Sequence, residues 1–189
     1  MVRHIVLASG SPRRRELLAG LGLEFEVRLL PGIDESYPSG LSGEEIAKTI
    51  SRKKATAYRQ SMAKDELIIT ADTIVCVDDR VLGKPKDEVE ATEMLKTLRG
   101  RSHQVITGVT LMTSDREETF AAVSNVTFSN ITDEEINYYI THFHPLDKAG
   151  AYGIQEWIGY IGVERIEGSY FNVMGLPVAR LYQALKQFL

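Results

Sequence analysis

The sequence predicts an α/β protein with a mixed, twisted sheet and flanking helices. Short apolar runs alternate with helical patterns in the first half of the chain, as in proteins whose parallel strands are joined through helices. In the second half two long apolar runs follow each other across a short polar turn, which predicts paired strands. The 189 residues are 43% hydrophobic and 25% charged, an ordinary globular composition that is sufficient for a substantial core in one or two lobes.

Strand and helix patterns follow one another through the first half. One side of the first predicted helix carries Leu17, Leu18 and Leu21. Gly20 and Gly22 mark its C-terminal end. The predicted elements are a strand over residues 4–8, a helix over 11–21, a strand over 25–30, a loop over 31–43, a helix over 44–62 and a strand over 67–77.

The most clearly specified element of the second half is a helix with Asp87 at its N-cap and Glu90 three residues further on. Its apolar residues recur at helical spacing, and Gly100 follows its end. The other predicted elements are strands over 105–112 and 120–128, a helix over 132–142, a glycine-rich segment over 147–162, a strand over 160–166 and a helix over 176–188.

The charge balance argues against partners that attract a whole basic surface. The chain has 22 Lys and Arg against 26 Asp and Glu, a net charge of -4, so neither nucleic acid nor membrane is an expected partner. No secretory signal and no apolar run of membrane-spanning length is visible, so we expect a cytoplasmic protein. Cys76 is the single cysteine, which excludes an internal disulfide framework.

Three arginines stand at the start of the first predicted helix, where their charge is unfavourable. Ser11 is a good N-cap and Pro12 a good first helical residue, yet Arg13, Arg14 and Arg15 follow. Each cation at a helix N-terminus costs about 0.3–1 kcal/mol unless an anion is near. A phosphate would accept bonds from the free backbone N–H groups and the guanidinium groups together. The alternative is that the three side chains extend into solvent.

Asp72 lies inside an apolar run, where a lone carboxylate is costly to bury. A metal ion, a lysine or a water awaiting deprotonation would each explain an ionised aspartate there, whereas capping of a turn is the plainer alternative. Lys84 precedes Pro85 between this strand and the next helix, and could reach a phosphate from there. Lys54 and Glu35 lie in the preceding helix and loop. Together such groups suit metal-assisted hydrolysis of a polyphosphate, although each is also compatible with plain solvated surface.

Familiar phosphate-binding motifs are absent from the sequence, which argues against a kinase or a dinucleotide-binding Rossmann protein. Neither a Gly-x4-Gly-Lys-Ser/Thr segment nor a Gly-x-Gly-x-x-Gly segment opening a helix is present. The four histidines show no spacing typical of metal ligands and are expected to be surface or structural residues.

Several segments, in the same order along the chain, resemble the Maf nucleotide pyrophosphatases. They are residues 7–18 (LASGSPRRRELL), 71–75 (ADTIV), 83–85 (GKP), 103–109 (HQVITGV), 168–170 (GSY) and 175–177 (GLP). The resemblance implies one domain over residues 1–189 with two lobes around a cleft, and a fold like that of the inosine triphosphate pyrophosphatases. It also implies a homodimer that hydrolyses a nucleoside triphosphate to the monophosphate and pyrophosphate with a divalent metal cation, Mg²⁺ or Mn²⁺.

The resemblance also implies roles for individual residues. Asp72 matches the proposed general base, and Glu35 and Asp72 are candidate metal ligands. Positions expected to hold the triphosphate or to take part in catalysis are Ser11, Arg14, Lys54 and Lys84. Positions linked to the choice of base are Arg13, Thr73 and Gln155.

The segment 147–155 (DKAGAYGIQ) resembles the branch of the family that acts on dTTP and UTP, with modified pyrimidine nucleotides as further candidates. The amide of Gln155 can donate and accept, as the edge of uracil or thymine requires. Glu156 departs from the glycine that many family members carry after this glutamine. The alternative function is a nucleotide-binding regulator of cell division or septum formation that needs no catalysis.

Overall fold

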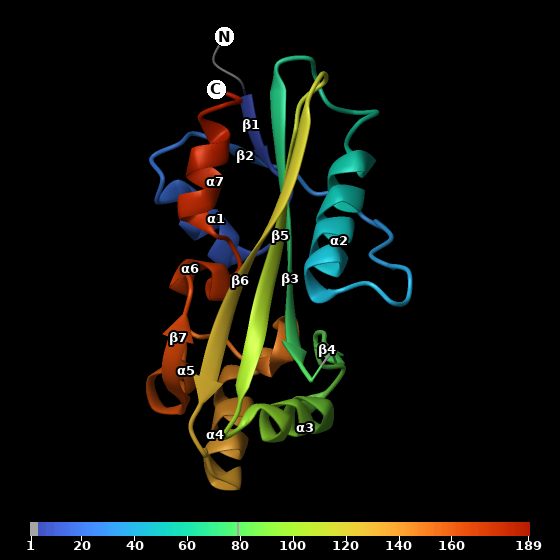
Figure 1. Cartoon of the computed structure of the whole chain (residues 1–189). Coiled ribbons are helices and arrows are strands. Elements are labelled where there is room, and N and C mark those ends of the chain that lie inside the picture. Colours follow the sequence, from blue (N-terminus) through green and yellow to red (C-terminus); the bar gives the residue numbers. More distant parts are fainter. Residues whose placement is uncertain (1–3, 79) are drawn as a thin grey trace. The chain divides into compact units, whose positions relative to one another are not determined.

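The structure is a computed structural model that describes residues 4–78 and 80–189. Its strands form one seven-stranded mixed sheet in the order β2-β1-β3-β5-β6-β7, with β4 paired to β3 (Figure 1). The strands are β1 His4–Leu7, β2 Glu26–Val27, β3 Glu66–Val77, β4 Arg80–Leu82, β5 Ser102–Met112, β6 Glu117–Phe128 and β7 Val163–Glu167. Parallel pairs (β1 with β2 and β3) and antiparallel pairs (β3 with β4, β6 with β7) both occur, which confirms the predicted mixed sheet.

Helices flank this sheet, as the sequence predicts. The α-helices are α1 Pro12–Ala19, α2 Gly43–Ala57, α3 Glu88–Leu98, α4 Asp133–Phe143, α5 Trp157–Gly162, α6 Tyr170–Met174 and α7 Val178–Leu185, and the short 3-10 helices are η1 Pro145–Asp147 and η2 Ala149–Ala151. Among the described residues, no helix has both the length and the apolar character needed to cross a membrane.

The chain divides into two compact units, each formed from several segments. The first comprises residues 1–73, 107–122 and 175–189, and the second comprises 74–106 and 123–174. Strands β3, β5 and β6 each contribute residues to both units.

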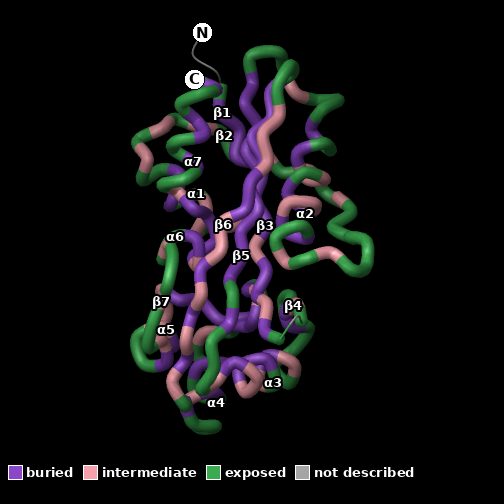
Figure 2. Tube along the Cα trace, in the orientation of Figure 1, coloured by how far each residue is buried: buried purple, intermediate pink, exposed green. Residues whose placement is uncertain are grey.

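In the first unit the strands are buried between helices. Figure 1 shows α2 on one face of these strands and α1 and α7 on the other, and Figure 2 shows buried residues along β1 and β3. Ser42 begins α2 with a capping box, because its hydroxyl accepts from the Glu45 backbone while the Glu45 carboxylate accepts from the Ser42 backbone. Gly108 of β5 lies so close to α2 that an added Cβ would be 2.2 Å from the Ala47 carbonyl oxygen. A glycine at this position therefore allows the helix to pack directly on the strand.

In the second unit the capped helices lie where the sequence predicts them. Asp87 caps α3 by accepting from the Glu90 backbone, and Thr132 begins α4 with a capping box to Glu135. Helix α3 packs against α4, η1 and η2. Strand β7 pairs with β6 at one edge of the sheet.

Four expected elements differ from the structure. The strand predicted over 25–30 is reduced to β2 of 2 residues, and the helix predicted over 44–62 ends at Ala57 in a series of turns. Part of the strand predicted over 160–166 belongs to α5, so that β7 begins at Val163. The helix predicted over 176–188 is the shorter α7. In the three cases other than 160–166, the apolar pattern extends beyond the backbone hydrogen bonds that define the element.

Candidate active site

The N-terminus of α1 has the cap that the sequence predicts. The Ser11 hydroxyl accepts from the Arg14 backbone at 3.4 Å, and Pro12 occupies the first helical turn. Ser9, at the end of the preceding segment, accepts from the Ser11 backbone at 3.3 Å. No acidic residue lies in this first turn, so the positive end of the helix has no carboxylate of its own.

Arg14 is the most extensively hydrogen-bonded side chain of this region. Its Nε donates to the Gly175 carbonyl at 2.8 Å, one terminal nitrogen donates to the Ala71 carbonyl at 2.9 Å, and the other donates to the Thr73 hydroxyl at 3.0 Å. The Ser9 hydroxyl lies 3.4 Å from the same nitrogen that contacts Ala71. Burial lowers the pKa of Arg14 from its usual value, and the charge of Asp72 opposes that shift. Most of the guanidinium group thus holds β3 and the chain at Gly175 in place around the start of α1.

Lys54 lies between two carboxylates. Its ammonium group is 2.7 Å from Asp72 Oδ1 and 3.1 Å from Glu35 Oε1. The Lys54 and Asp72 side chains are largely buried, with exposed fractions of 15% and 13%, whereas Glu35 is exposed at 57%. Asp72 lies within β3 rather than at a turn, so the turn-capping alternative is wrong and a lysine partner is present. The structure therefore brings a strand, a helix and a loop together through one buried cation.

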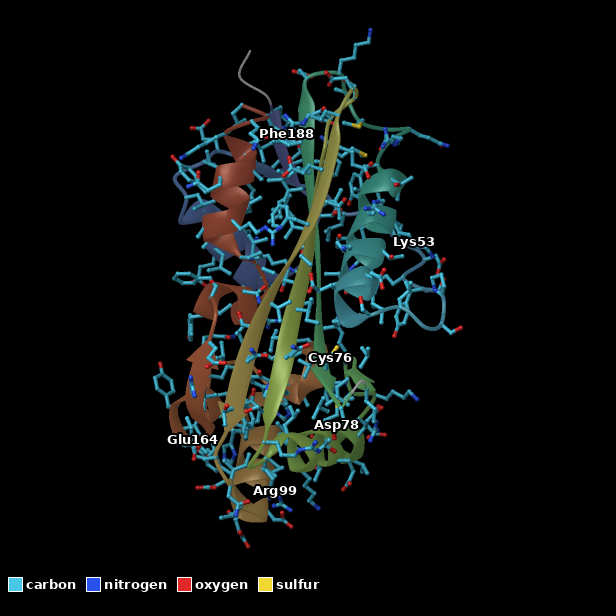
Figure 3. The ribbon with its side chains drawn as sticks, viewed as in Figure 1. Lys53, Cys76, Asp78, Arg99, Glu164 and Phe188 are labelled. Carbon is cyan, nitrogen blue, oxygen red and sulfur yellow. The ribbon has the colours of Figure 1, made fainter. Side chains whose placement is uncertain are left out.

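A second ion pair next to the first fastens the loop to α2. The Lys53 ammonium donates to Asp34 at 2.8 Å and to the Ser36 carbonyl at 2.7 Å, and it lowers the pKa of the Asp34 carboxyl group. Figure 3 shows Lys53 on the side of α2 where this loop runs. A pocket of about 670 Å³ lies here, between residues 30–34 and the adjacent face of α2, and its lining includes Lys53 and Asp34 but neither Lys54 nor Asp72.

The remaining predicted site residues are divided between the two units. Thr73 belongs to the first unit and is bound by Arg14, and Arg13 is partly buried in α1. Lys84 and Gln155 belong to the second unit. Lys84 is exposed, and its side chain makes no hydrogen bond or ion pair with the residues in 4–78 and 80–189. The Gln155 amide oxygen is buried and accepts no hydrogen bond from any described residue.

Two contributors were not assigned roles from the sequence. Ser9 bonds to both Ser11 and Arg14, and the Gly175 carbonyl accepts from Arg14. Gly175 has φ of 120°, which favours glycine because other residues rarely adopt that conformation. Its place in the 175–177 segment was a visible signal, but its partner is 161 residues away in the sequence.

Comparisons with known proteins show the family to which the chain belongs. Residues 4–188 match the family described as Maf-like protein. The chain belongs to the Maf-like protein family. A relative from Phocaeicola vulgatus is 61% identical over 183 residues, which cover 97% of this chain and 95% of the relative, and it is named dTTP/UTP pyrophosphatase. Relatives with the same name from Bacteroides thetaiotaomicron and Flavobacterium johnsoniae are 57% and 45% identical, covering 97% and 96% of this chain and 95% and 93% of the relatives.

A solved structure shows the same fold. A HAM1 protein from Coxiella burnetii superimposes with a TM-score of 0.54 at 18% identity, covering 98% of this chain and 99% of that protein. This likeness confirms the expected fold of the inosine triphosphate pyrophosphatase type.

Proposed function

We propose that this chain hydrolyses dTTP and UTP, together with modified pyrimidine nucleotides, to the nucleoside monophosphate and pyrophosphate. The observation that carries the proposal is the Lys54 ammonium group held between Asp72 and Glu35. Such a site offers positive charge to phosphates and two carboxylates to a water or a metal ion. The names of relatives up to 61% identical support an enzyme rather than a regulator without catalysis.

The triphosphate is expected to bind to the start of α1 and the basic side chains of the site. Helix N-termini are common anion sites, and the first turn of α1 contains no acidic residue that would oppose an anion. Lys54 and the charge of Arg14 favour a polyanion. A role for Lys84, an exposed lysine of the second unit, is proposed from the family resemblance alone. Because Arg14 already donates to two backbone carbonyls and two hydroxyls, we assign it mainly to holding the site in shape.

The carboxylates present fit a divalent metal cation. Glu35 and Asp72 provide hard oxygen donors that already converge on one cation, and Mg²⁺ is commonly held by one or two carboxylates plus substrate phosphates. Within residues 4–78 and 80–189, no group of three or more His, Cys, Asp and Glu side chains forms a complete metal site. A metal that binds together with the nucleotide fits this donor set. When bound, Mg²⁺ or Mn²⁺ would neutralise phosphate charge and lower the pKa of a coordinated water.

Asp72 is the residue we assign to the attacking water. Its carboxylate is largely buried, is fixed on a central strand and is held by Lys54 through one oxygen, Oδ1. The other oxygen has no hydrogen-bond partner among residues 4–78 and 80–189, and we assign it to orient a water and accept its proton during attack at the phosphate next to the nucleoside. Lys54 then serves twice, since it fixes Asp72 and presents charge to the phosphates.

The base is expected to be read by Arg13, Thr73 and Gln155. The buried amide oxygen of Gln155 is suited to accept the N3–H of uracil or thymine, which cytosine lacks. We further propose that the chain works in the cytoplasm as a homodimer, which the family resemblance implies.

The test is the identity of the inorganic product. The purified protein with Mg²⁺ or Mn²⁺ is given dTTP, UTP, CTP, 7-methyl-GTP and ITP, and both pyrophosphate and orthophosphate are measured. We expect pyrophosphate from dTTP and UTP, and orthophosphate as the first product would contradict the proposal.

A pair of matched variants tests the role of Asp72. Asp72→Asn should remove turnover and leave the fold intact, because it removes the proton acceptor without changing the shape of the side chain. Asp78→Asn makes the same chemical change at an exposed residue paired with Arg101, and should keep full turnover. Retained turnover in Asp72→Asn would exclude this residue as the base.

A further inference from the structure

Glu156, which follows the residue assigned to base recognition, is held by two buried side chains. Its Oε2 accepts a hydrogen bond from the Tyr139 hydroxyl, and its Oε1 lies 3.1 Å from the Lys148 ammonium group. Lys148 is 9% exposed and also pairs with Asp147 at 2.7 Å, so a buried cation compensates the Glu156 charge. Glu156 stands at the N-cap of α5, yet its carboxylate makes no capping bond. Local helix capping therefore does not account for this carboxylate.

The same tyrosine closes the turn that carries Gln155. The Tyr139 hydroxyl accepts from the Gly153 backbone at 3.0 Å and donates to Glu156, and the Glu156 backbone donates to the Gly153 carbonyl at 3.0 Å. Burial, together with the hydrogen bond to Glu156, raises the pKa of Tyr139 above its usual value, so the hydroxyl stays protonated and remains a donor. Both ends of the four-residue turn over 153–156 are therefore bound to one side chain of α4.

The Gln155 amide and the Glu156 carboxylate fold back over Gly153. A Cβ added to Gly153 would lie 3.0 Å from Gln155 Nε2 and 3.0 Å from Glu156 Oε2. Both groups therefore lie close to the same point beside Gly153, where the negative charge of the carboxylate favours the NH₂ end of the amide over its carbonyl oxygen. The amide oxygen is the end left without a partner among the described residues.

The orientation of this amide decides which pyrimidine edge it reads. An amide that rotates freely by half a turn can pair with the N3–H and O4 of uracil or with the N3 and N4–H₂ of cytosine, because it carries a donor and an acceptor side by side. An amide held with its oxygen towards the base accepts from the N3–H and cannot pair with the bare N3 of cytosine. Selectivity that depends on this amide therefore requires a group that holds it.

We propose that Glu156, held by Lys148 and Tyr139, fixes the orientation of the Gln155 amide and so makes the site select uracil and thymine over cytosine. This inference rests on the proposed function, in which Gln155 contacts the base. Glu156, Lys148 and Tyr139 are positioning residues that act through Gln155. They should influence the choice of base and leave the phosphate chemistry unchanged.

The experiment measures kcat and KM for UTP and CTP in the wild type, Glu156→Gln and Tyr139→Phe. Glu156→Gln removes the charge that orients the amide, and Tyr139→Phe keeps the buried ring while removing both hydrogen bonds of the hydroxyl. In both variants we expect the ratio of kcat/KM for UTP to that for CTP to fall by about 2- to 12-fold, the factor for one neutral hydrogen bond. The change should lie in KM, with kcat for UTP almost constant.

A matched variant separates this effect from lost stability. Tyr58→Phe also removes a buried hydroxyl with two hydrogen bonds. This hydroxyl accepts from the Leu30 backbone N–H and donates to the Arg28 carbonyl oxygen. Its melting temperature should fall as in Tyr139→Phe, while its ratio of UTP to CTP stays at the wild-type value. A changed ratio in Tyr58→Phe would mean that lost stability alone alters the ratio, and would overturn the inference.

A Gln155→Ala variant separates the inference from the proposed function. Wild-type protein that releases no pyrophosphate from any pyrimidine nucleotide would overturn the proposed function itself. A wild type that prefers UTP, and loses that preference in Gln155→Ala, supports the function. If Glu156→Gln and Tyr139→Phe then keep the wild-type ratio, the function stands and the positioning role of Glu156 is overturned.

Discussion

His103 is expected to make the stability of the protein depend on pH between neutrality and pH 5. It is 3% exposed, its Nε2 is 2.7 Å from the Tyr152 hydroxyl, and the rings of Phe128 and Tyr152 contact it edge to face. Its Nδ1 is buried without a hydrogen-bond partner among the described residues. Burial lowers the pKa of His103 from 6.5 to about 4, because no group in this apolar surrounding compensates an imidazolium charge.

The sign and size of the effect follow from proton linkage. Between pH 6.5 and pH 4 the unfolded chain binds a proton at His103 and the folded chain does not, so stability is complete above this range and falls as the pH decreases. With these two pKa values the free energy of unfolding should fall by about 2 kcal/mol between pH 7 and pH 5.

Urea unfolding of the wild type and His103→Gln at the two pH values measures this contribution. We expect the variant to be less stable at both pH values, so the comparison uses the decrease in the free energy of unfolding from pH 7 to pH 5. This decrease should be smaller in His103→Gln than in the wild type by about 2 kcal/mol. His142→Gln, at an exposed histidine, should keep the wild-type change. An equal change in the wild type and His103→Gln would refute the assignment of a neutral, desolvated imidazole.

Three further predictions concern packing, the arginine and the metal. Gly108→Ala should lower the free energy of unfolding by about 1–3 kcal/mol, because its Cβ would meet the Ala47 carbonyl. Gly83→Ala, at a position with open space around it, should change the free energy of unfolding little. Equal urea midpoints for the two variants would contradict this packing. Arg14→Lys should lower the free energy of unfolding by about 1–3 kcal/mol and reduce pyrophosphate release, since one ammonium group cannot reach these separate acceptors. A variant with wild-type stability would argue against the role of Arg14 in holding β3 and the chain at Gly175. A chelator should stop pyrophosphate release without shifting the melting temperature of the nucleotide-free protein, and a lower melting temperature would indicate a metal bound before the nucleotide.

Local signals predicted the elements that local interactions determine. The caps Asp87 and Thr132 are decided within one helical turn, so α3 and α4 begin where the sequence places them. Helix α5 was missed because residues 147–162 were described only as a glycine-rich segment and residues 160–166 were predicted as a strand. Gly159 lies where a Cβ would be 1.8 Å from the Ile154 carbonyl oxygen, so here glycine permits a close backbone approach within a short helix. Composition alone does not distinguish that use of glycine from its use in a flexible loop.

The sequence singled out the charged residues proposed for the site but not their partners. Asp72 was recognisable because a carboxylate inside an apolar run needs compensation. Its pairing with Lys54 depends on α2 packing against β3, which brings together residues 18 positions apart in the chain. Roles for Lys84 and Gln155 stay predictions from the family resemblance, since both belong to the second unit.

Contacts within the protein explain part of the unusual arginine cluster at the start of α1. An unfavourable cation at a helix N-terminus predicted a phosphate, yet Arg14 directs its N–H groups to two backbone carbonyls and a hydroxyl. Neutral acceptors satisfy hydrogen bonds without cancelling charge, and Asp72, which does carry charge, is already paired with Lys54. Of the two explanations that the sequence allowed, extension into solvent does not describe Arg14, and phosphate binding at this helix terminus stays a prediction.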